Sequence, residues 1–507
     1  MRILAVVLAL ALAFSAAACT KTTPSDQSGA NTETKEASKD NKGYAKVIYA
    51  FPSFAGAPQD KAVVEEAMNV ILREKAGAEI ELMPIPFMEY QEKVTLMLSG
   101  GEKLDLLTDH GTIIPYANAV GKGYYTDITD IIEEHGKGVL EAVGDQFLSA
   151  AAVNGRYYGM PTVHDIATGF GFSIRKDWLD ETGIDCSNIQ TMDQMTPVWE
   201  AIKKNHPDAY PLYLSGAGVL SVKANASIDV LDNFLGVLID GTKDLTVVDW
   251  FESDMYYNDV KLFHEWYEKG YIKPEGASST DSYYTLAQAG QVAANMQGAK
   301  PGQDAQDTAS AGGLPITSVM VGHQYSSTAI AAGVMTTVPA SATDPVASVK
   351  VMNELYTNPE LINLLNYGIE GKHYVLTEDG QVTFPEGLDA TNDPYYWSLN
   401  WAFGNEFISY TTVQQDKDVW KQTDEFNKTA TISKAMGFTF DTKNVKTEIT
   451  AVENVCSKYR PGLETGELDP DETLPKFIEE LKTAGIDTII AEKQKQLDAW
   501  AKENGVQ

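Results

Sequence analysis

Cysteine is scarce in this chain, with 3 residues among 507. A dense disulfide framework is therefore excluded as the source of its stability. Cys19 lies close to the N-terminus, so only Cys186 and Cys456 could pair with each other in the folded body. They could form one bridge outside the cell, but two cysteines so far apart in sequence fit buried thiols at least as well. The composition leaves this pairing open.

Positive charge is also in short supply, because 39 Lys and Arg stand against 71 Asp and Glu, for a formal net charge of −32. Residues 20–43 are balanced, with four Lys and four acidic side chains, so the excess belongs to the rest of the chain. Nucleic acids and anionic lipid surfaces both require a basic footprint. We therefore expect no nucleic-acid partner and no membrane contact other than a lipid anchor.

The apolar run at the N-terminus, residues 3–14, is too short to span a bilayer, which takes about 20 residues. Arg2 precedes this run and small residues follow it, an order typical of a secretion signal. Cys19 directly after small residues resembles the lipobox of bacterial lipoproteins, although Ala16 stands where that motif usually has Leu. The resemblance implies a signal peptide over 1–19, lipidation of Cys19 and a location on the extracellular face of the cell membrane. The alternative is an ordinary signal peptide with an incidental cysteine.

Residues 20–43 contain no large apolar side chain and are predicted to be a disordered tether. More than 450 residues follow, which is too many for one core and enough for two lobes.

The first part of the body alternates strand and helix patterns. Strands are predicted over 45–51, 78–86 and 104–109, and helices with apolar residues at helical spacing over 59–77 and 88–101. This βαβαβ order predicts an α/β fold with a parallel sheet and right-handed crossovers.

In such sheets a ligand sits beyond the carboxyl ends of the strands, where the strand order reverses. If the first strand lies between the second and third, the loops 51–54 and 108–111 frame that crevice. Phe51, Ser53, Asp109 and His110 are therefore predicted ligand contacts. Asp109 is the best placed of these, because a carboxylate accepts paired hydroxyl groups strongly.

The join between two strand-like runs, residues 163–168, is where we place a first crossing into a second lobe, and residues 325–332 look like the return. This predicts one lobe from 44–165 plus about 325–390, and another from 166–324 plus about 391–507. His164 and Asp165 lie in the join and are candidate ligand contacts. Near the C-terminus two apolar stripes predict helices that are broken at Gly485.

The segment 392–407 holds six aromatic residues in sixteen. Trp397 and Trp401 are four apart and would share one face of a helix. Such rings either fill a core or stack on sugar rings, because Trp and Tyr offer a flat face with a hydrogen-bonding edge. We expect one ring to pack and Trp397 or Trp401 to reach a ligand, with Asn405 beside them as a donor and acceptor.

No motif of a known catalytic or cofactor site is present. The glycine pairs lack the third glycine of a dinucleotide fingerprint, and no phosphate-binding loop occurs. Glu268 replaces the second histidine of a zinc motif that begins at His264, and Leu474 replaces the glycine of a calcium loop. We expect no cofactor, no metal and no enzymatic activity, although 71 acidic residues always leave paired carboxylates available for a glycosidase.

Several longer segments resemble the extracellular solute-binding proteins of family 1, the lipid-anchored receptors of Gram-positive carbohydrate ABC importers. The resemblance is carried by "MLSGGEKLDLL", "GRYYGMPT", "FSIRKDWLDETGID", "YEKGYI", "LYTNPELINLLNYGIEGKHY" and "LKTAGIDTIIAEKQKQLDAW". The last two resemble a lipoprotein subgroup whose C-terminal region is often labelled as of unknown function. "AGQVAANMQGAK" is similar to a strand of the family that borders the ligand, which adds Asn295 as an expected contact. Lys300 stands where the family's stacking tryptophan is expected.

The resemblance implies a two-lobed periplasmic-binding-protein-like fold with a hinge and a ligand cleft between the lobes. It also implies a monomeric receptor that delivers an oligosaccharide or other sugar to an ABC transporter permease. The alternatives are a cell-surface glycosidase or lyase, or the same receptor binding a peptide or a phosphorylated sugar.

Overall fold

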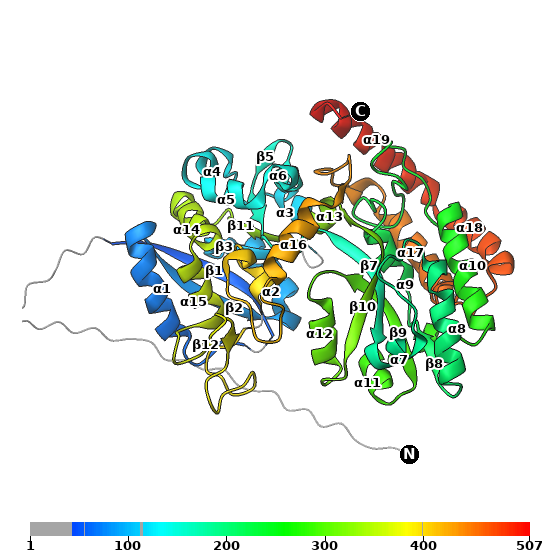
Figure 1. The fold of residues 1–507 in the computed structure, drawn as a ribbon. Coiled ribbons are helices and arrows are strands. Elements are labelled where there is room, and N and C mark those ends of the chain that lie inside the picture. Colours follow the sequence, from blue (N-terminus) through cyan, green and yellow to red (C-terminus); the bar gives the residue numbers. More distant parts are fainter. Residues whose placement is uncertain (1–42, 55, 112–114, 398, 507) are drawn as a thin grey trace, which may run out of the picture. The chain divides into compact units, whose positions relative to one another are not determined.

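Two five-stranded sheets and two small two-stranded sheets organise the part of the chain that the computed structural model describes, residues 43–54, 56–111, 115–397 and 399–506 (Figure 1). The predicted signal peptide, Cys19 and the predicted tether up to residue 42 lie outside these residues.

The first sheet has the order β2-β1-β3-β11-β6. β1 (Ala45–Ser53) runs parallel to β2 (Ala78–Pro86) and to β3 (Leu106–His110), so the first strand does lie between the second and third. β11 (Val334–Thr337) is antiparallel to β3 and to β6 (Gly159–Pro161). The carboxyl ends of the three parallel strands therefore meet at one edge of this sheet.

The crossovers of this sheet are α1 (Lys61–Lys75) and α2 (Phe87–Gly100). α1 buries Val64, Met68 and Leu72, which are four residues apart and so lie on one face. α2 ends at Gly101, whose φ of 65° suits glycine in a left-handed cap. Other helices that contribute to the same core are α3 (Tyr116–Gly121), α4 (Thr129–His135), α5 (Lys137–Val143), α6 (Asp145–Ala151), α14 (Pro345–Thr357) and α15 (Pro359–Tyr367).

The second sheet has the order β14-β10-β7-β9-β8. β7 (Thr168–Arg175) is central and antiparallel to both β10 (Ile316–Ser326) and β9 (Val292–Ala299). The edge strands β8 (Tyr210–Tyr213) and β14 (Thr431–Ile432) run parallel to their neighbours. The remaining strands form small hairpin-like pairs, β4 (Ala152–Val153) with β5 (Arg156–Tyr157) and β12 (Val375–Leu376) with β13 (Val382–Thr383).

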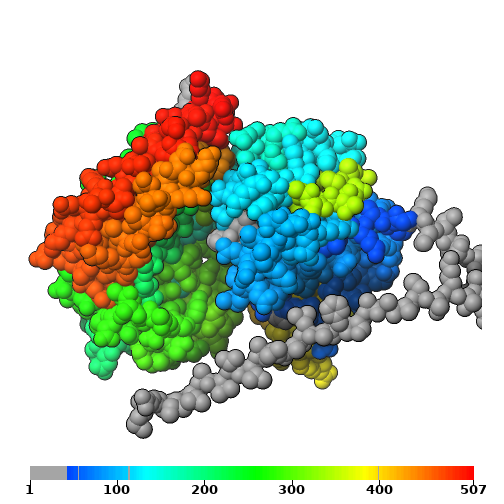
Figure 2. Space-filling model, turned by 180° about the vertical axis from the view of Figure 1, so that it is seen from behind, coloured from blue at the N-terminus to red at the C-terminus, as the bar shows by residue number. Residues whose placement is uncertain are grey.

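A second core forms on this sheet. Its helices are α7 (Lys176–Thr182), α8 (Thr196–Asn205), α9 (Val219–Asn225), α10 (Asp254–Glu268), α17 (Lys446–Glu464), α18 (Pro470–Ala484) and α19 (Ile486–Asn504), while α11 (Tyr283–Gln288) and α12 (Gln303–Ser310) contact β9 and β10. The break predicted at Gly485 separates α18 from α19, and Figure 2 shows these orange-to-red C-terminal helices lying on the green part of the chain.

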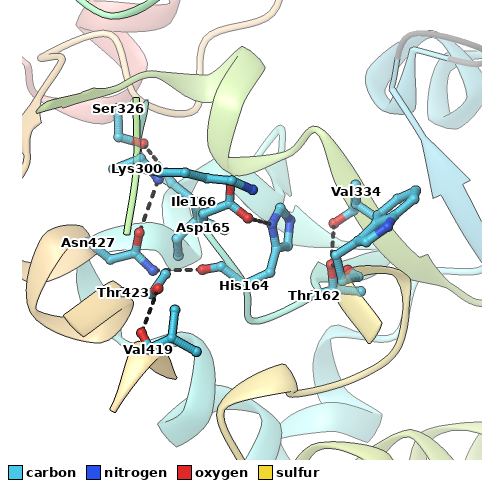
Figure 3. A network of polar contacts seen from close by, with 12 residues as sticks. Thr162, His164, Asp165, Ile166, Lys300, Ser326, Val334, Val419, Thr423 and Asn427 are labelled. Carbon is cyan, nitrogen blue, oxygen red and sulfur yellow. Dashed lines mark hydrogen bonds and ion pairs between the residues drawn. The ribbon is translucent and has the colours of Figure 1, made fainter. Parts of the chain in front are cut away.

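The chain passes between the two cores three times. It leaves the first core after Ile166 and returns to it at Ala331 in α13 (Thr328–Ala331). It reaches the second core again at Ala435 by way of α16 (Val419–Lys428), where Met436 still packs on the first core. Polar contacts tie these passages together, as Figure 3 shows. The Ser326 hydroxyl donates to the Ile166 carbonyl at 2.6 Å, and the Asn427 amide donates to the His164 carbonyl at 2.7 Å.

The aromatic segment departs from the prediction in two respects. It was expected in the second lobe, but Tyr395, Trp397 and Phe403 belong to the first core. It was expected to be helical, but among the described residues its regular pieces are the short 3₁₀ turns Asn400–Ala402 and Glu406–Ile408, the second of which runs one residue past the segment. The reason is local, because the Asp393 carboxylate accepts from the Tyr395 amide at 2.7 Å and forms a turn that competes with a helix.

Cys186 and Cys456 are free thiols rather than a disulfide. Cys456 is buried, and burial raises its thiol pKa to about 12.

Candidate functional site

A cavity of about 720 Å³, within the usual range for small-molecule sites, is lined by residues of the first core, of α12 beside the second sheet and of the passages between the cores. The carboxyl end of β3 supplies His110, the first passage supplies His164 and Asp165, and the residue after β9 is Lys300. The other side of the cavity comes from α15, from residues 373–415 and from α16.

Aromatic rings form much of the lining. They are Tyr367, Tyr374, Phe384, Tyr395, Tyr396, Trp401 and Trp420. Trp401 stands edge-on to His110 at 5.7 Å between ring centroids, and the Thr162 hydroxyl donates to its carbonyl oxygen at 3.0 Å. Tyr367 is held by its hydroxyl, which donates to the Tyr410 carbonyl at 2.7 Å. The rings of the lining offer flat surfaces to a ligand.

A charged cluster lies on the lining beside the rings. Asp165 accepts from Lys300 at 2.9 Å and lies 3.1 Å from Nδ1 of His164. Burial acts to raise the pKa of Asp165, but Lys300 and His164 outweigh it and hold this pKa well below its usual range. Burial likewise acts to lower the pKa of Lys300, and Asp165 reverses that effect. Both groups are therefore charged at neutral pH.

Glu406 is the second carboxyl group on the lining. Burial raises its pKa to about 8, the Asp165 carboxylate adds to this rise and Lys300 opposes it. At neutral pH Glu406 is therefore largely protonated and can donate a hydrogen bond.

Two polar groups on the lining have no hydrogen-bond partner in the described part of the chain. Asn366 is 2% exposed, and neither its amide nitrogen nor its amide oxygen is paired. Nε2 of the His164 ring is buried and unpaired as well. Buried polar groups are nearly always paired in proteins. These groups thus mark where a polar ligand would complete the hydrogen bonding.

Four of the predicted ligand contacts line the cavity, namely His110, His164, Asp165 and Trp401. Burial lowers the pKa of His110, and its neighbour His164 adds to the effect, so neutral His110 is favoured.

Two predicted aromatic contacts belong to the first core instead. Phe51 is 0% and Trp397 is 3% exposed, and their rings meet edge-on at 5.2 Å. They pack against each other because Phe51 lies on a central strand and the segment around Trp397 covers that strand.

The remaining predicted contacts also lie off the cavity lining. Asp109 is buried and accepts from the Tyr125 hydroxyl at 2.8 Å, and burial raises its pKa to about 7. The Ser53 hydroxyl donates to the Gly56 carbonyl at 2.8 Å. Asn295 lies within β9, between β7 and β8. Asn405 holds a turn, because its side chain accepts from the Phe407 amide at 3.0 Å.

Lys300, Asn366, Glu406, Tyr367 and Trp420 line the cavity but were not predicted as contacts. Lys300 had one signal, since it occupies the position where the resembling family carries a stacking ring. Asn366 had a weaker one, because it and Asn363 are polar residues on the buried face of "LINLLNY".

No cluster of side chains in the described residues could hold a metal ion. Among the same residues, no helix is both long and apolar enough to cross a membrane.

The fold is that of a bacterial extracellular solute-binding protein. The model of that family matches residues 33–361, well over half of the chain, and the chain belongs to this family. A domain of unknown function, DUF3502, matches residues 434–502.

Two similar proteins come from Streptococcus pneumoniae and Bacillus subtilis. A carbohydrate ABC transporter substrate-binding protein of Streptococcus pneumoniae is 29% identical over 86% of this chain and 87% of its own length. Lipoprotein LipO of Bacillus subtilis is 22% identical over 70% of this chain and 72% of its own. These relatives are a substrate-binding protein and a lipoprotein, and neither is named as an enzyme.

A solved structure with the same fold is the N-glycan transport solute binding protein NgtS of S. pneumoniae. It has a TM-score of 0.77 and 24% identity, and the match covers 90% of this chain and 99% of that one. The predicted two-lobed α/β fold is thereby confirmed.

Proposed function

We propose that this protein captures a neutral oligosaccharide in the cavity and delivers it to an ABC import permease. The observation that carries the proposal is the unpaired Asn366 amide on a lining rich in aromatic rings. Rings stack on the apolar faces of sugars, and an amide serves hydroxyl groups as both donor and acceptor. The names of the relatives support this reading, since one is a carbohydrate receptor and another transports N-glycans.

The charges of the cavity favour a neutral ligand over a phosphorylated one. Lys300 is the one Lys or Arg among the described lining residues, and Asp165 already neutralises it. The cavity residue Gly302 caps the N-terminus of α12, a feature that suits a phosphate. Asp165 carries a negative charge that would repel such a group.

One feature favours a second candidate, a glycosidase. Asp165 and Glu406 have pKa values moved in opposite directions, which is what an acid and a nucleophile or base require. Asp165 is, however, engaged by both Lys300 and His164, so it is poorly available to a sugar carbon. We therefore place Asp165 and Glu406 in binding rather than in catalysis.

The test is calorimetric titration of the purified protein with neutral glycans that include Man1GlcNAc and Man5GlcNAc, ligands found with NgtS. We expect saturable binding, no new reducing ends and a smaller radius of gyration in small-angle scattering, because such receptors close on their ligand. Release of new reducing ends would support the glycosidase, and an unchanged radius of gyration would contradict closure.

Asn366→Ala is the variant that links binding to the cavity. We expect at least a tenfold loss of affinity, about 1.4 kcal/mol, with little loss of stability, because the amide has no hydrogen-bond partner among the residues that the structure describes. The matched control is Asn363→Ala on the same helix. The Asn363 amide donates to the Pro359 carbonyl at 2.7 Å and accepts from the Tyr410 amide at 2.9 Å, so this change should lower stability instead. Normal affinity in Asn366→Ala would place the site elsewhere.

We further propose that Cys19 carries a lipid that holds the protein on the extracellular face of the membrane, with residues 20–43 as a tether. Cys19→Ser is expected to fold normally and to be released from the membrane fraction into the soluble fraction or the medium. Cell fractionation with a high-salt wash measures this. A Cys19→Ser protein that stays with the membrane through the wash would show that the lipid is not the anchor.

A further inference from the structure

A row of aromatic side chains follows the carboxyl ends of the three parallel strands of the first sheet. Phe54 comes directly after β1, Phe87 directly after β2, and His110 is the last residue of β3. The register pairs Ser53 with Pro86, so the next residues of these two strands, Phe54 and Phe87, emerge side by side.

The row is continuous with the cavity. The ring centroids of Phe54 and Phe87 are 5.0 Å apart, those of Phe87 and His110 are 6.4 Å apart, and those of His110 and Trp401 are 5.7 Å apart. His110 and Trp401 line the cavity, whereas Phe54 and Phe87 do not. The rings thus lead from the cavity to the protein surface.

The outer end of the row is open to solvent. Phe54 is 61% exposed, and Met88, the residue after Phe87, is 93% exposed. A single exposed apolar side chain is ordinary on a protein surface. Adjacent exposed apolar side chains that continue a binding cavity instead indicate a surface that a ligand covers.

We propose that Phe54 and Phe87 form an outer subsite for sugar units that extend beyond the cavity. The proposal rests on the proposed function, since it assigns a second part of the same ligand. It implies that the natural ligand is long enough to reach from Trp401 to Phe54, and that a short glycan fills the cavity alone.

The chemistry of this edge suits neutral sugars. Phe has no polar group, so Phe54 and Phe87 would act through contact of their ring faces with the apolar face of a sugar ring. The first turn of α2, which begins at Phe87, carries the acidic residue Glu89, and its charge disfavours an anionic unit at this position. The Ser53 hydroxyl, on the residue before Phe54, donates to the Gly56 carbonyl at 2.8 Å and is therefore engaged beside the ring.

The experiment compares a short and a long glycan on one set of variants. Titrations with Man1GlcNAc and Man5GlcNAc are made on the unchanged protein, on Phe54→Ala and on Phe54→Trp. The control is Leu96→Ala, which removes a 63% exposed side chain from α2 nine residues after Phe87, about 14 Å along the helix.

We expect Phe54→Ala to weaken the long glycan fivefold to tenfold, roughly the contribution of one stacked ring, and to leave the short glycan unchanged. Phe54→Trp should bind both as the unchanged protein does, and Leu96→Ala should change neither. Because Phe54 is exposed, all variants should melt at the same temperature.

Other results would overturn the subsite. Equal losses for the two glycans, or no loss for either, would show that Phe54 does not contact outer units. Normal binding combined with lost uptake in cells would assign the row to the permease. If neither the unchanged protein nor Asn366→Ala binds any neutral glycan, the proposed function itself is wrong. This result differs from the two above, in which glycan binds but Phe54 does not contribute to it.

Discussion

Trp397→Ala is expected to be strongly destabilised and to bind glycan normally once folded. Trp397 is 3% exposed and packs edge-on against Phe51 at 5.2 Å and Tyr395 at 5.4 Å. Truncating a buried Trp leaves a large void, for which about 3 to 5 kcal/mol of stability is a typical loss. Chemical denaturation measures the loss, and titration of the folded fraction measures the affinity.

Trp401→Ala is the matched variant, because it removes the same side chain four residues later. Trp401 is half-buried on the cavity lining and stands edge-on to His110. We expect it to lose roughly ten- to hundredfold in affinity, or about 1 to 3 kcal/mol, with a smaller change in melting. If both variants melt far lower and bind normally when refolded, both rings belong to the core and the sugar platform lies elsewhere.

The first sheet could be predicted because its signals are local. Alternating or continuous apolar residues define each strand, and the spacing of Val64, Met68 and Leu72 defines the helix between the first two. The strand β2 begins and ends at Ala78 and Pro86, as predicted. The rule that parallel crossovers are right-handed then limits the strand order to few possibilities, and the observed order β2-β1-β3 is one of them.

The aromatic segment could not be predicted in the same way. Its rings repeat at a spacing that suits a helix, but a turn at Asp393 and the left-handed Gly404, with a φ of 42°, interrupt it. Which core it joins depends on contacts with residues more than three hundred positions earlier, such as Phe51. Sequence periodicity carries no information on such contacts.

The candidate site likewise contains residues that could be predicted from the sequence and residues that could not. His110 and the pair His164 and Asp165 were predicted from topology, because strand ends and crossing segments border the cavity in this architecture. Asp109 was predicted by the same argument but points to the other side of the strand, since neighbouring side chains alternate. Asn366 and Trp420 come from helices whose placement depends on the whole fold, so sequence position alone could not select them.

Lys493 connects the C-terminal domain of unknown function to the rest of the second core. Its ammonium group is buried and donates to the Asn233 side-chain oxygen and the Gly236 carbonyl, each at 2.8 Å. Burial lowers the pKa of Lys493 to about 7, while Asp232 and Asp229 act to raise it. Lys493 therefore supplies the charged hydrogen-bond donor for the oxygen atoms of the loop that contains Asn233 and Gly236.

Lys493→Met is expected to lower the free energy of unfolding by about 3 to 5 kcal/mol, the range for removing one partner of a buried charged cluster. The loop carbonyls lose their donor and the buried carboxyl groups lose their counter-charge, and methionine replaces neither. Chemical denaturation of the full chain measures the change. The control is Lys495→Met on the same helix, which removes an exposed ammonium group paired with Glu492 and should change stability by no more than about 0.5 kcal/mol.

The pH dependence of the free energy of unfolding of the same variants separates the effect of the buried Lys493 charge from an effect of packing alone. With a pKa of about 7 in the folded chain and an ordinary value of 10.5, Lys493 binds fewer protons in the folded than in the unfolded state between these two pH values. The stability of the unchanged protein therefore gains a rising contribution as the pH increases through this window, and Lys493→Met lacks it. The stability difference between Lys493→Met and Lys495→Met should widen from about pH 7 to about pH 9. A difference that stays constant over this range would mean that Lys493 keeps its charge in the folded protein and acts only through its contacts with the loop.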